Sequence, residues 1–68
     1  MKRYVYVTFP DGSIAKRFTA RSYTHAVACL RDGVWCAAAY CGSYRLALNQ
    51  LRGVSAVFPG AIILPVFE

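Results

Sequence analysis

Few side chains in this 68-residue chain could carry out a reaction, because it holds three acidic residues, one histidine and three cysteines. Asp11 and Asp32 each precede a glycine, a pairing typical of turns, so a pair of catalytic carboxylates is not indicated. His25 and Cys29 lie four residues apart, which would bring them to one face of a helix as a Cys–His nucleophilic pair. A half-exposed histidine beside a small apolar residue explains the same spacing. We therefore expect a protein that is not an enzyme.

The three cysteines, Cys29, Cys36 and Cys41, contain no CxxC motif and lie among apolar residues. Free cysteine commonly behaves as a small buried hydrophobe, and an odd number cannot all pair within one chain. We expect free thiols in a reducing, cytoplasmic compartment. Their spacing with His25 matches no familiar zinc pattern, and no glycine-rich phosphate loop occurs, so we expect neither a metal nor a cofactor.

A basic and aromatic surface is the strongest indication of a binding site. The segment Arg3–Phe9 alternates as a strand, with three apolar residues on one side and Tyr4 and Tyr6 on the other. Basic residues flank the two tyrosines. The candidate contact residues on or beside this hairpin are Tyr4, Tyr6, Lys16, Arg17 and Arg21.

The return strand Ser13–Thr19 decides which side chains of the hairpin share a face. If Asp11 and Gly12 form a two-residue turn, Tyr6 lies opposite Arg17. Lys16 then falls on the apolar side of the hairpin, so its ammonium must extend past the edge of the sheet to reach solvent. This arrangement predicts that the second strand lies at the edge of its sheet.

The remaining elements follow from caps, spacing and length. Ser22 is a good N-cap for a helix that ends at Asp32-Gly33, and Val34–Cys41 predicts a central strand. Ser43 begins a second helix, which could end at Gly53 but is expected to continue to Phe58 because its apolar stripe does. Residues 61–67 predict a last strand, with its proline at an edge or an end.

This order predicts a single α+β domain over residues 1–68. We expect a two-layer, four-stranded, mainly antiparallel sheet with two helices on one face (ββαβαβ) and the tyrosines on the open face. The expected core residues are Val5, Val7, Phe9, Ile14, Phe18, Val27, Leu30, Leu48 and Leu51.

Composition points to a binding partner. The net charge is +5, and five of the eight basic residues fall within the first 21 positions. Hydrophobic residues make up 57% of the chain, more than one small core can hide, so part of the apolar surface should face a partner or a second copy of the chain. No apolar run approaches the roughly 18 residues of a membrane span, and Lys2-Arg3 leads directly into the first strand, so we expect no membrane partner.

Several short runs resemble small phage-encoded orphan proteins. These runs are Phe9-Pro-Asp-Gly-Ser13, Arg21-Ser-Tyr-Thr-His-Ala-Val27 and Gly42-Ser-Tyr-Arg-Leu-Ala47, together with Arg17. Some compact phage proteins of this size are anti-CRISPR inhibitors, which bind a host effector complex and block its DNA recognition or nuclease recruitment. The resemblance implies a viral inhibitor acting in the host cell cytoplasm. This chain differs from the acidic, DNA-mimicking members because its net charge is positive. It should therefore dock on an acidic or apolar protein surface, or touch nucleic acid directly.

Two binding functions are therefore open. The first is an anti-CRISPR-like protein that inhibits or modulates a host protein or nucleoprotein complex through its basic, aromatic surface. The alternative is a nucleic-acid-binding module that stacks bases on its tyrosines and holds phosphates with its basic residues. A homodimer would also cover the apolar surface. We expect tight, salt-tolerant binding to a protein and weaker, salt-sensitive contact with nucleic acid.

Overall fold

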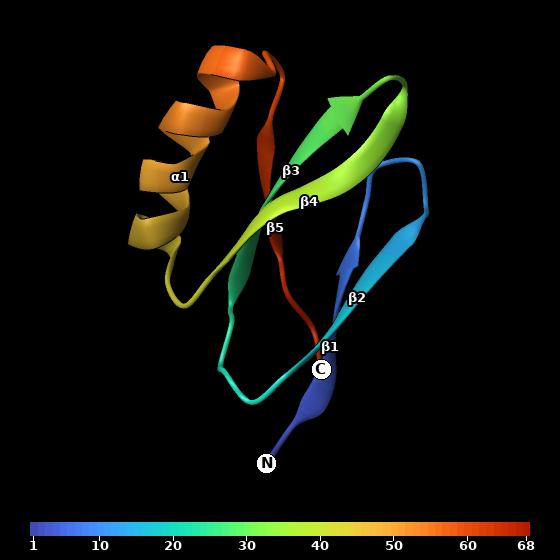
Figure 1. Cartoon of the computed structure of the whole chain (residues 1–68), viewed down its shortest axis with the longest axis vertical. Coiled ribbons are helices and arrows are strands. Elements are labelled where there is room, and N and C mark those ends of the chain that lie inside the picture. Colours follow the sequence, from blue (N-terminus) through green and yellow to red (C-terminus); the bar gives the residue numbers. More distant parts are fainter.

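The computed structural model describes all 68 residues, and they form five strands and one helix (Figure 1). The elements are β1 (Arg3–Thr8), β2 (Ile14–Thr19), β3 (His25–Arg31), β4 (Val34–Cys41), α1 (Tyr44–Val57) and β5 (Ile62–Pro65). The prediction of an α+β domain is confirmed. The predicted four-stranded sheet with two helices on one face is wrong.

The elements form three layers rather than two. The antiparallel sheet β4-β3-β5 lies in the middle, with α1 on one face and the β1–β2 hairpin on the other (Figure 1). On the helix side, Ala47 packs against Val27 and Cys41. On the hairpin side, Val7 and Phe9 pack against small residues of β3. Helix and hairpin therefore cover both faces of the middle sheet, and the outer face of the hairpin is left uncovered.

The predicted first helix is the central strand β3. Residues 26–29 are all at most 1% exposed, because β3 lies between two strands and between two layers. A strand buried on both faces is a continuous apolar run, which contains helical spacings by chance. Val34–Cys41 is a strand as predicted, but it lies at an edge of this sheet rather than in its centre.

The Asp32-Gly33 pair, which the sequence predicts to end a helix, is the tight turn that joins β3 to β4. Arg31 pairs with Val34, so the turn has two residues. Asp32 and Gly33 have φ values of 52° and 80°, the positive values that a type I′ hairpin turn requires. Asp-Gly is the sequence typical of this turn, and it marks a hairpin here.

The first hairpin has a three-residue loop, which shifts its register by one residue from the prediction. Phe9 pairs with Ser13 through its amide, which donates to the Ser13 carbonyl at 2.8 Å, and Asp11 Oδ1 accepts the Ser13 amide at 2.9 Å. A two-residue turn would need Pro10 to donate a closing hydrogen bond, and proline has no N–H. Tyr6 therefore lies opposite Lys16, and Arg17 lies opposite Val5.

This register explains which predicted core residues are buried. Val5, Val7, Phe9 and Val27 are buried, and Leu51 is half-buried against the helix-side core. Four predicted core residues are exposed: Ile14, Phe18, Leu30 and Leu48. The first two lie on the outer face of β2 because of the register shift. Lys16 is there too, so its predicted place on the apolar face is wrong, although β2 is an edge strand as predicted.

The last helix and strand follow the prediction. The Ser43 side chain caps α1 by accepting the Leu46 amide at 3.2 Å, and the helix continues through Gly53 to Val57. After it, β5 pairs with β3 and ends at Pro65. The chain then bridges to β1, where Tyr6 and Phe67 exchange main-chain hydrogen bonds of 2.6 and 2.8 Å. That bridge ties the hairpin to the rest of the molecule.

Two glycines should respond in opposite ways to replacement by alanine. Gly53 lies inside α1 and a Cβ there would meet nothing within 4 Å, so Gly53→Ala should raise the free energy of unfolding by about 0.4–1 kcal/mol. A Cβ at Gly12 would also meet nothing, but its φ of +88° is strained for alanine, so Gly12→Ala should lower that free energy. Urea unfolding of both variants measures this. The same sign of change at both positions would contradict the assigned backbone conformations.

Candidate functional site

The outer face of the first hairpin presents large apolar side chains to solvent. We call this surface the aromatic hairpin face, and its members are Tyr4, Tyr6, Ile14, Lys16 and Phe18. The exposed fractions of the four apolar side chains, in that order, are 46%, 38%, 63% and 56%. They all lie on one side of β1 and β2, because they alternate with Val5 and Val7 on β1 and with Ala15, Arg17 and Thr19 on β2.

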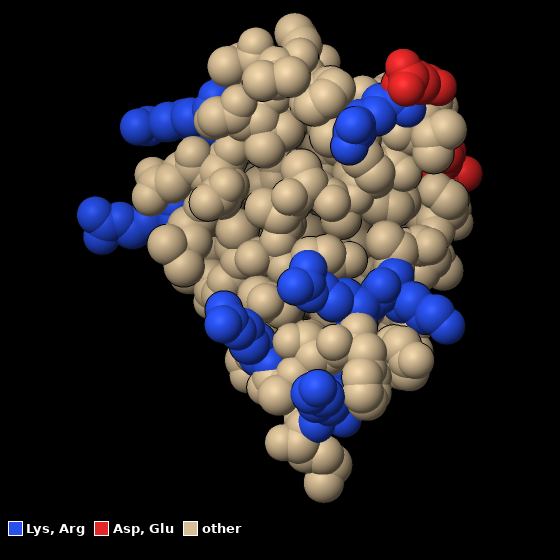
Figure 2. All heavy atoms as spheres, in the orientation of Figure 1, with Lys and Arg blue, Asp and Glu red and all other residues tan.

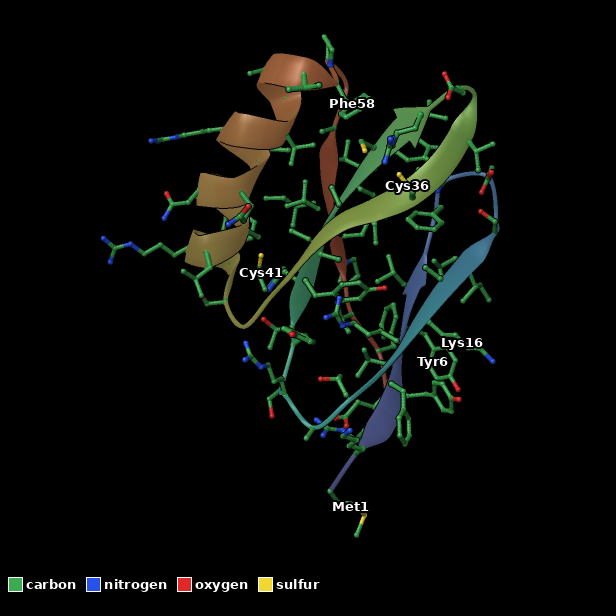
Figure 3. The ribbon with its side chains drawn as sticks, in the orientation of Figure 1. Met1, Tyr6, Lys16, Cys36, Cys41 and Phe58 are labelled. Carbon is green, nitrogen blue, oxygen red and sulfur yellow. The ribbon has the colours of Figure 1, made fainter.

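Tyr4 is the centre of the aromatic hairpin face. Its ring centroid lies 4.8 Å from that of Phe18 and 6.5 Å from that of Tyr6. The Lys16 Nζ lies 5.0 Å from the Tyr4 centroid, a cation–π contact. Figure 3 shows Tyr6 and Lys16 on the side of the hairpin that faces away from α1. The rings therefore hold one another in place on an open surface.

Phe67, which follows β5, extends this face beyond β1. It lies directly opposite Tyr6 in the antiparallel bridge, so the two side chains are on the same side. Its side chain is 53% exposed. The sequence prediction missed Phe18, Ile14 and Phe67 as members of this surface, because only the register and the late bridge bring them beside the two tyrosines.

Arg17 and Arg21 lie elsewhere, in a second surface that we call the arginine–tyrosine cleft. The Arg17 guanidinium carbon lies 5.2 Å from the Tyr40 ring centroid and 5.8 Å from that of Tyr23. The two rings are themselves 5.6 Å apart. The cleft has a volume of about 380 Å³, and its lining residues are Arg17, Arg21, Tyr23, Ala39, Tyr40, Cys41, Gly42, Leu46 and Gln50.

The five predicted contact residues therefore divide into two groups. Tyr4, Tyr6 and Lys16 gather on the aromatic hairpin face, as the sequence predicted for the tyrosines. Arg17 does not lie opposite Tyr6, and it points to the other side of β2. Together with Arg21 it lines the cleft between the β2–β3 segment, β4 and α1.

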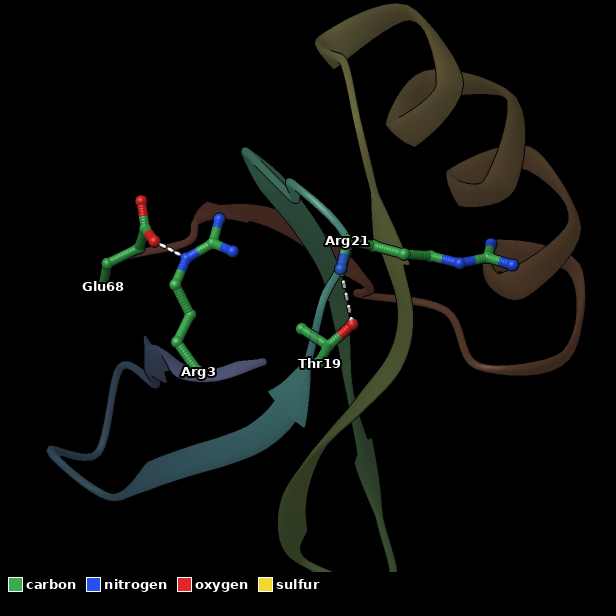
Figure 4. Close-up of polar contacts among 4 residues, drawn as sticks. All are labelled: Arg3, Thr19, Arg21 and Glu68. Carbon is green, nitrogen blue, oxygen red and sulfur yellow. Dashed lines mark hydrogen bonds and ion pairs between the residues drawn. The ribbon is translucent and has the colours of Figure 1, made fainter. Parts of the chain in front are cut away.

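The arginines of the cleft have no acidic partner. Glu68 pairs with Arg3, which is the one ion pair of the protein, and both other acidic residues lie in hairpin turns (Figure 4). The Arg21 amide donates to Thr19 Oγ1 at 3.0 Å, and its side chain extends toward α1 (Figure 4). In Figure 2 several basic side chains gather over the lower half of the molecule and others project from its upper half, whereas the acidic side chains in view lie only at the upper right. The cleft is thus a region of unbalanced positive charge.

Tyr40, like Tyr23, is a partly buried member of the cleft. Burial raises the pKa of its hydroxyl above the ordinary 10.0, and the nearby Arg17 guanidinium opposes that rise by favouring the charged form. At neutral pH Tyr40 is therefore a neutral hydrogen-bond donor.

The three cysteines and the histidine are not gathered in one cluster: Cys29 lies opposite Cys36, and His25 lies opposite Cys41 at the other end of the β3–β4 pair. The Sγ atoms of Cys29 and Cys36 lie 3.7 Å apart across β3 and β4, as free thiols. His25 Nδ1 lies 2.8 Å from the Thr24 hydroxyl, and its ring meets that of Tyr44 edge-on at 5.4 Å. The i, i+4 spacing of His25 and Cys29 belongs to a strand, where it separates them by about 13 Å of chain. A Cys–His pair at these positions is therefore wrong.

The buried thiols and Tyr40 should make stability fall at alkaline pH. Burial raises the pKa of Cys29 and Cys41 above 9.0 and that of Tyr40 above 10.0. Above these ordinary values the unfolded chain loses protons that the folded chain keeps, so the free energy of unfolding decreases as the pH rises. Urea unfolding at about pH 7 and about pH 10 measures the decrease. Replacing both Cys29 and Cys41 by alanine should reduce it, and stability that is constant or rising over this range would contradict the burial.

Comparison with known proteins gives no relative for this arrangement. No protein-family model, curated protein or solved structure matches the chain. Its one helix, α1, lacks the length and apolar character needed to cross a membrane.

Proposed function

We propose that the protein is a non-enzymatic binding module that docks on a partner protein through the aromatic hairpin face. The observation that supports this most is the row of exposed, mutually packed rings on an otherwise uncovered sheet face. Large contiguous apolar patches on small proteins mark interaction sites. Tyrosine and other aromatic residues are also the types that most often anchor protein interfaces.

The rings are suited to act as anchors because they are already ordered. Tyr4 packs against Phe18 and under the Lys16 ammonium, so little side-chain entropy is left to lose on binding. Lys16 is the charged residue that β2 contributes to the face, and with the net charge of +5 it favours a partner surface that is acidic around an apolar centre. Such docking agrees with the inhibition of a host nucleoprotein machine that the resemblance to phage proteins implies.

The nucleic-acid alternative loses support on this face. A stacking platform needs cations to hold the phosphates beside the rings. Arg17 and Arg21 lie off the face, which leaves Lys16 as the one basic residue that β1 and β2 contribute to it. A second copy of the chain could also cover the rings, and this outcome is included in the test.

The test is capture of a defined partner from host lysate by the tagged protein and by two variants. Wild type and Arg17→Ala should recover the same protein complex, at both low and raised salt, because burial of apolar area has no charge to screen. Tyr4→Ala should lose that complex. The proposal is overturned if Tyr4→Ala retains the complex, if nucleic acid alone is recovered, or if the only partner is the protein itself in a stable dimer.

A further inference from the structure

We propose that the arginine–tyrosine cleft is a second, separate site that binds the phosphate of a nucleotide. It shares no residue with the aromatic hairpin face, so it does not depend on the function proposed above. Its four principal side chains come from three parts of the fold: Arg17 from β2, Arg21 and Tyr23 from the segment before β3, and Tyr40 from β4.

Arg17 is held in position before any ligand arrives. Its guanidinium lies within reach of both the Tyr23 and the Tyr40 ring, at 5.8 and 5.2 Å from their centroids. The planar guanidinium fork matches two oxygens of a phosphate, and a guanidinium already held beside two rings loses little freedom when it forms these hydrogen bonds. No carboxylate competes for it, since the acids are paired with Arg3 or placed in the turns.

Arg21 supplies the second cation. Its backbone is fixed by the hydrogen bond to the buried Thr19 side chain, and the side chain extends toward α1, which forms the far wall (Figure 4). Two guanidinium groups that line one concave surface would repel each other, and a doubly charged phosphate placed between them removes that repulsion. The cleft thus has the charge of an anion site.

The rest of the lining suits the nucleoside part of the ligand. A volume of about 380 Å³ lies within the range of small-molecule sites, which begins near 300 Å³, and exceeds what a bare phosphate needs. Leu46 and Ala39 offer apolar surface, and the Gln50 amide can both donate and accept a hydrogen bond. Bases stack on tyrosine rings and on the face of an arginine guanidinium. A ligand that combines a phosphate with a base able to stack on these surfaces is a nucleotide, either free or at the end of a nucleic-acid strand.

Calorimetric titration of the full chain tests this with four probes: adenosine monophosphate, adenosine, inorganic phosphate and a short 5′-phosphorylated single strand. The monophosphate should bind at least about ten-fold more tightly than adenosine or phosphate alone, because it uses both parts of the cleft. A further gain with the strand identifies nucleic acid as the source, and equal affinity identifies the free nucleotide. Both outcomes support the site.

Matched charge variants separate a built site from general attraction. Arg17→Ala and Arg21→Ala should each weaken monophosphate binding at least about ten-fold. Lys16→Ala removes the same charge from the opposite side of β2 and should change it less than about two-fold. The proposal is overturned if all three variants weaken binding equally, if neither arginine variant weakens it, or if no phosphate-bearing probe binds at millimolar concentration. Unchanged thermal unfolding of the variants excludes misfolding as the cause of a loss.

Discussion

Replacing Phe9 by alanine should lower the free energy of unfolding by about 3–5 kcal/mol. Phe9 is 5% exposed, and its ring stacks against Trp35 with centroids 6.3 Å apart, at the centre of the core between hairpin and sheet. Removing the ring leaves a cavity that the neighbouring strands cannot fill. A domain of this size has a total stability of roughly 3–10 kcal/mol, so the variant should be largely unfolded or close to it. Urea unfolding monitored by circular dichroism measures the change.

Phe18→Ala is the matched control, because it removes the same atoms from the other face of the hairpin. Phe18 is 56% exposed and contacts Tyr4 on the outer surface, so its loss should cost less than about 1 kcal/mol. The ratio of the two losses in the free energy of unfolding therefore shows which phenylalanine faces the core, and so reports the register of the first hairpin. Equal costs would mean that Phe18 belongs to the core, as a two-residue turn would require, and that the three-residue loop is wrong.

Replacing Tyr4 by alanine should weaken binding to the partner protein by about 30-fold, equivalent to about 2 kcal/mol. Tyr4 lies at the centre of the aromatic hairpin face, where its ring contacts Tyr6, Phe18 and Lys16. Its removal therefore takes away an anchor and loosens the remaining rings. Calorimetric titration with the captured partner measures the loss.

Two variants control this second result. Tyr4→Phe keeps the ring and should retain most of the affinity, and Arg17→Ala changes a residue outside the face and should change it by less than about three-fold. A loss of affinity with Arg17→Ala that equals the loss with Tyr4→Ala would show that docking uses the cleft instead.

Much of the fold could be predicted from local patterns. The alternation of β1 assigns Val5 and Val7 to the inside and Tyr4 and Tyr6 to the outside, and the structure confirms both. The Ser43 cap and the apolar stripe beyond Gly53 give the helix and its length. Strand β3 could not be recognised by periodicity, because a strand buried on both faces has no alternation to reveal it.

The candidate site was predictable only in part, because its membership depends on one backbone donor. Pro10 lacks an N–H, so the first hairpin closes with a three-residue loop, and the side chains of β2 change faces. That single residue moves Phe18 out to join the tyrosines and turns Arg17 toward Tyr40. Phe67 joins through a bridge to a strand 61 positions earlier in the chain, which no local pattern indicates.

The most direct measurement of the central claim is nuclear magnetic resonance mapping of the complex with the captured partner. Docking through the aromatic hairpin face predicts that the ring signals of Tyr4, Tyr6 and Phe18 shift or broaden on binding. The ring signals of Tyr23 and Tyr40, in the cleft, should stay in place. Perturbations confined to the cleft or to α1, with the outer rings of the hairpin unchanged, would contradict the account.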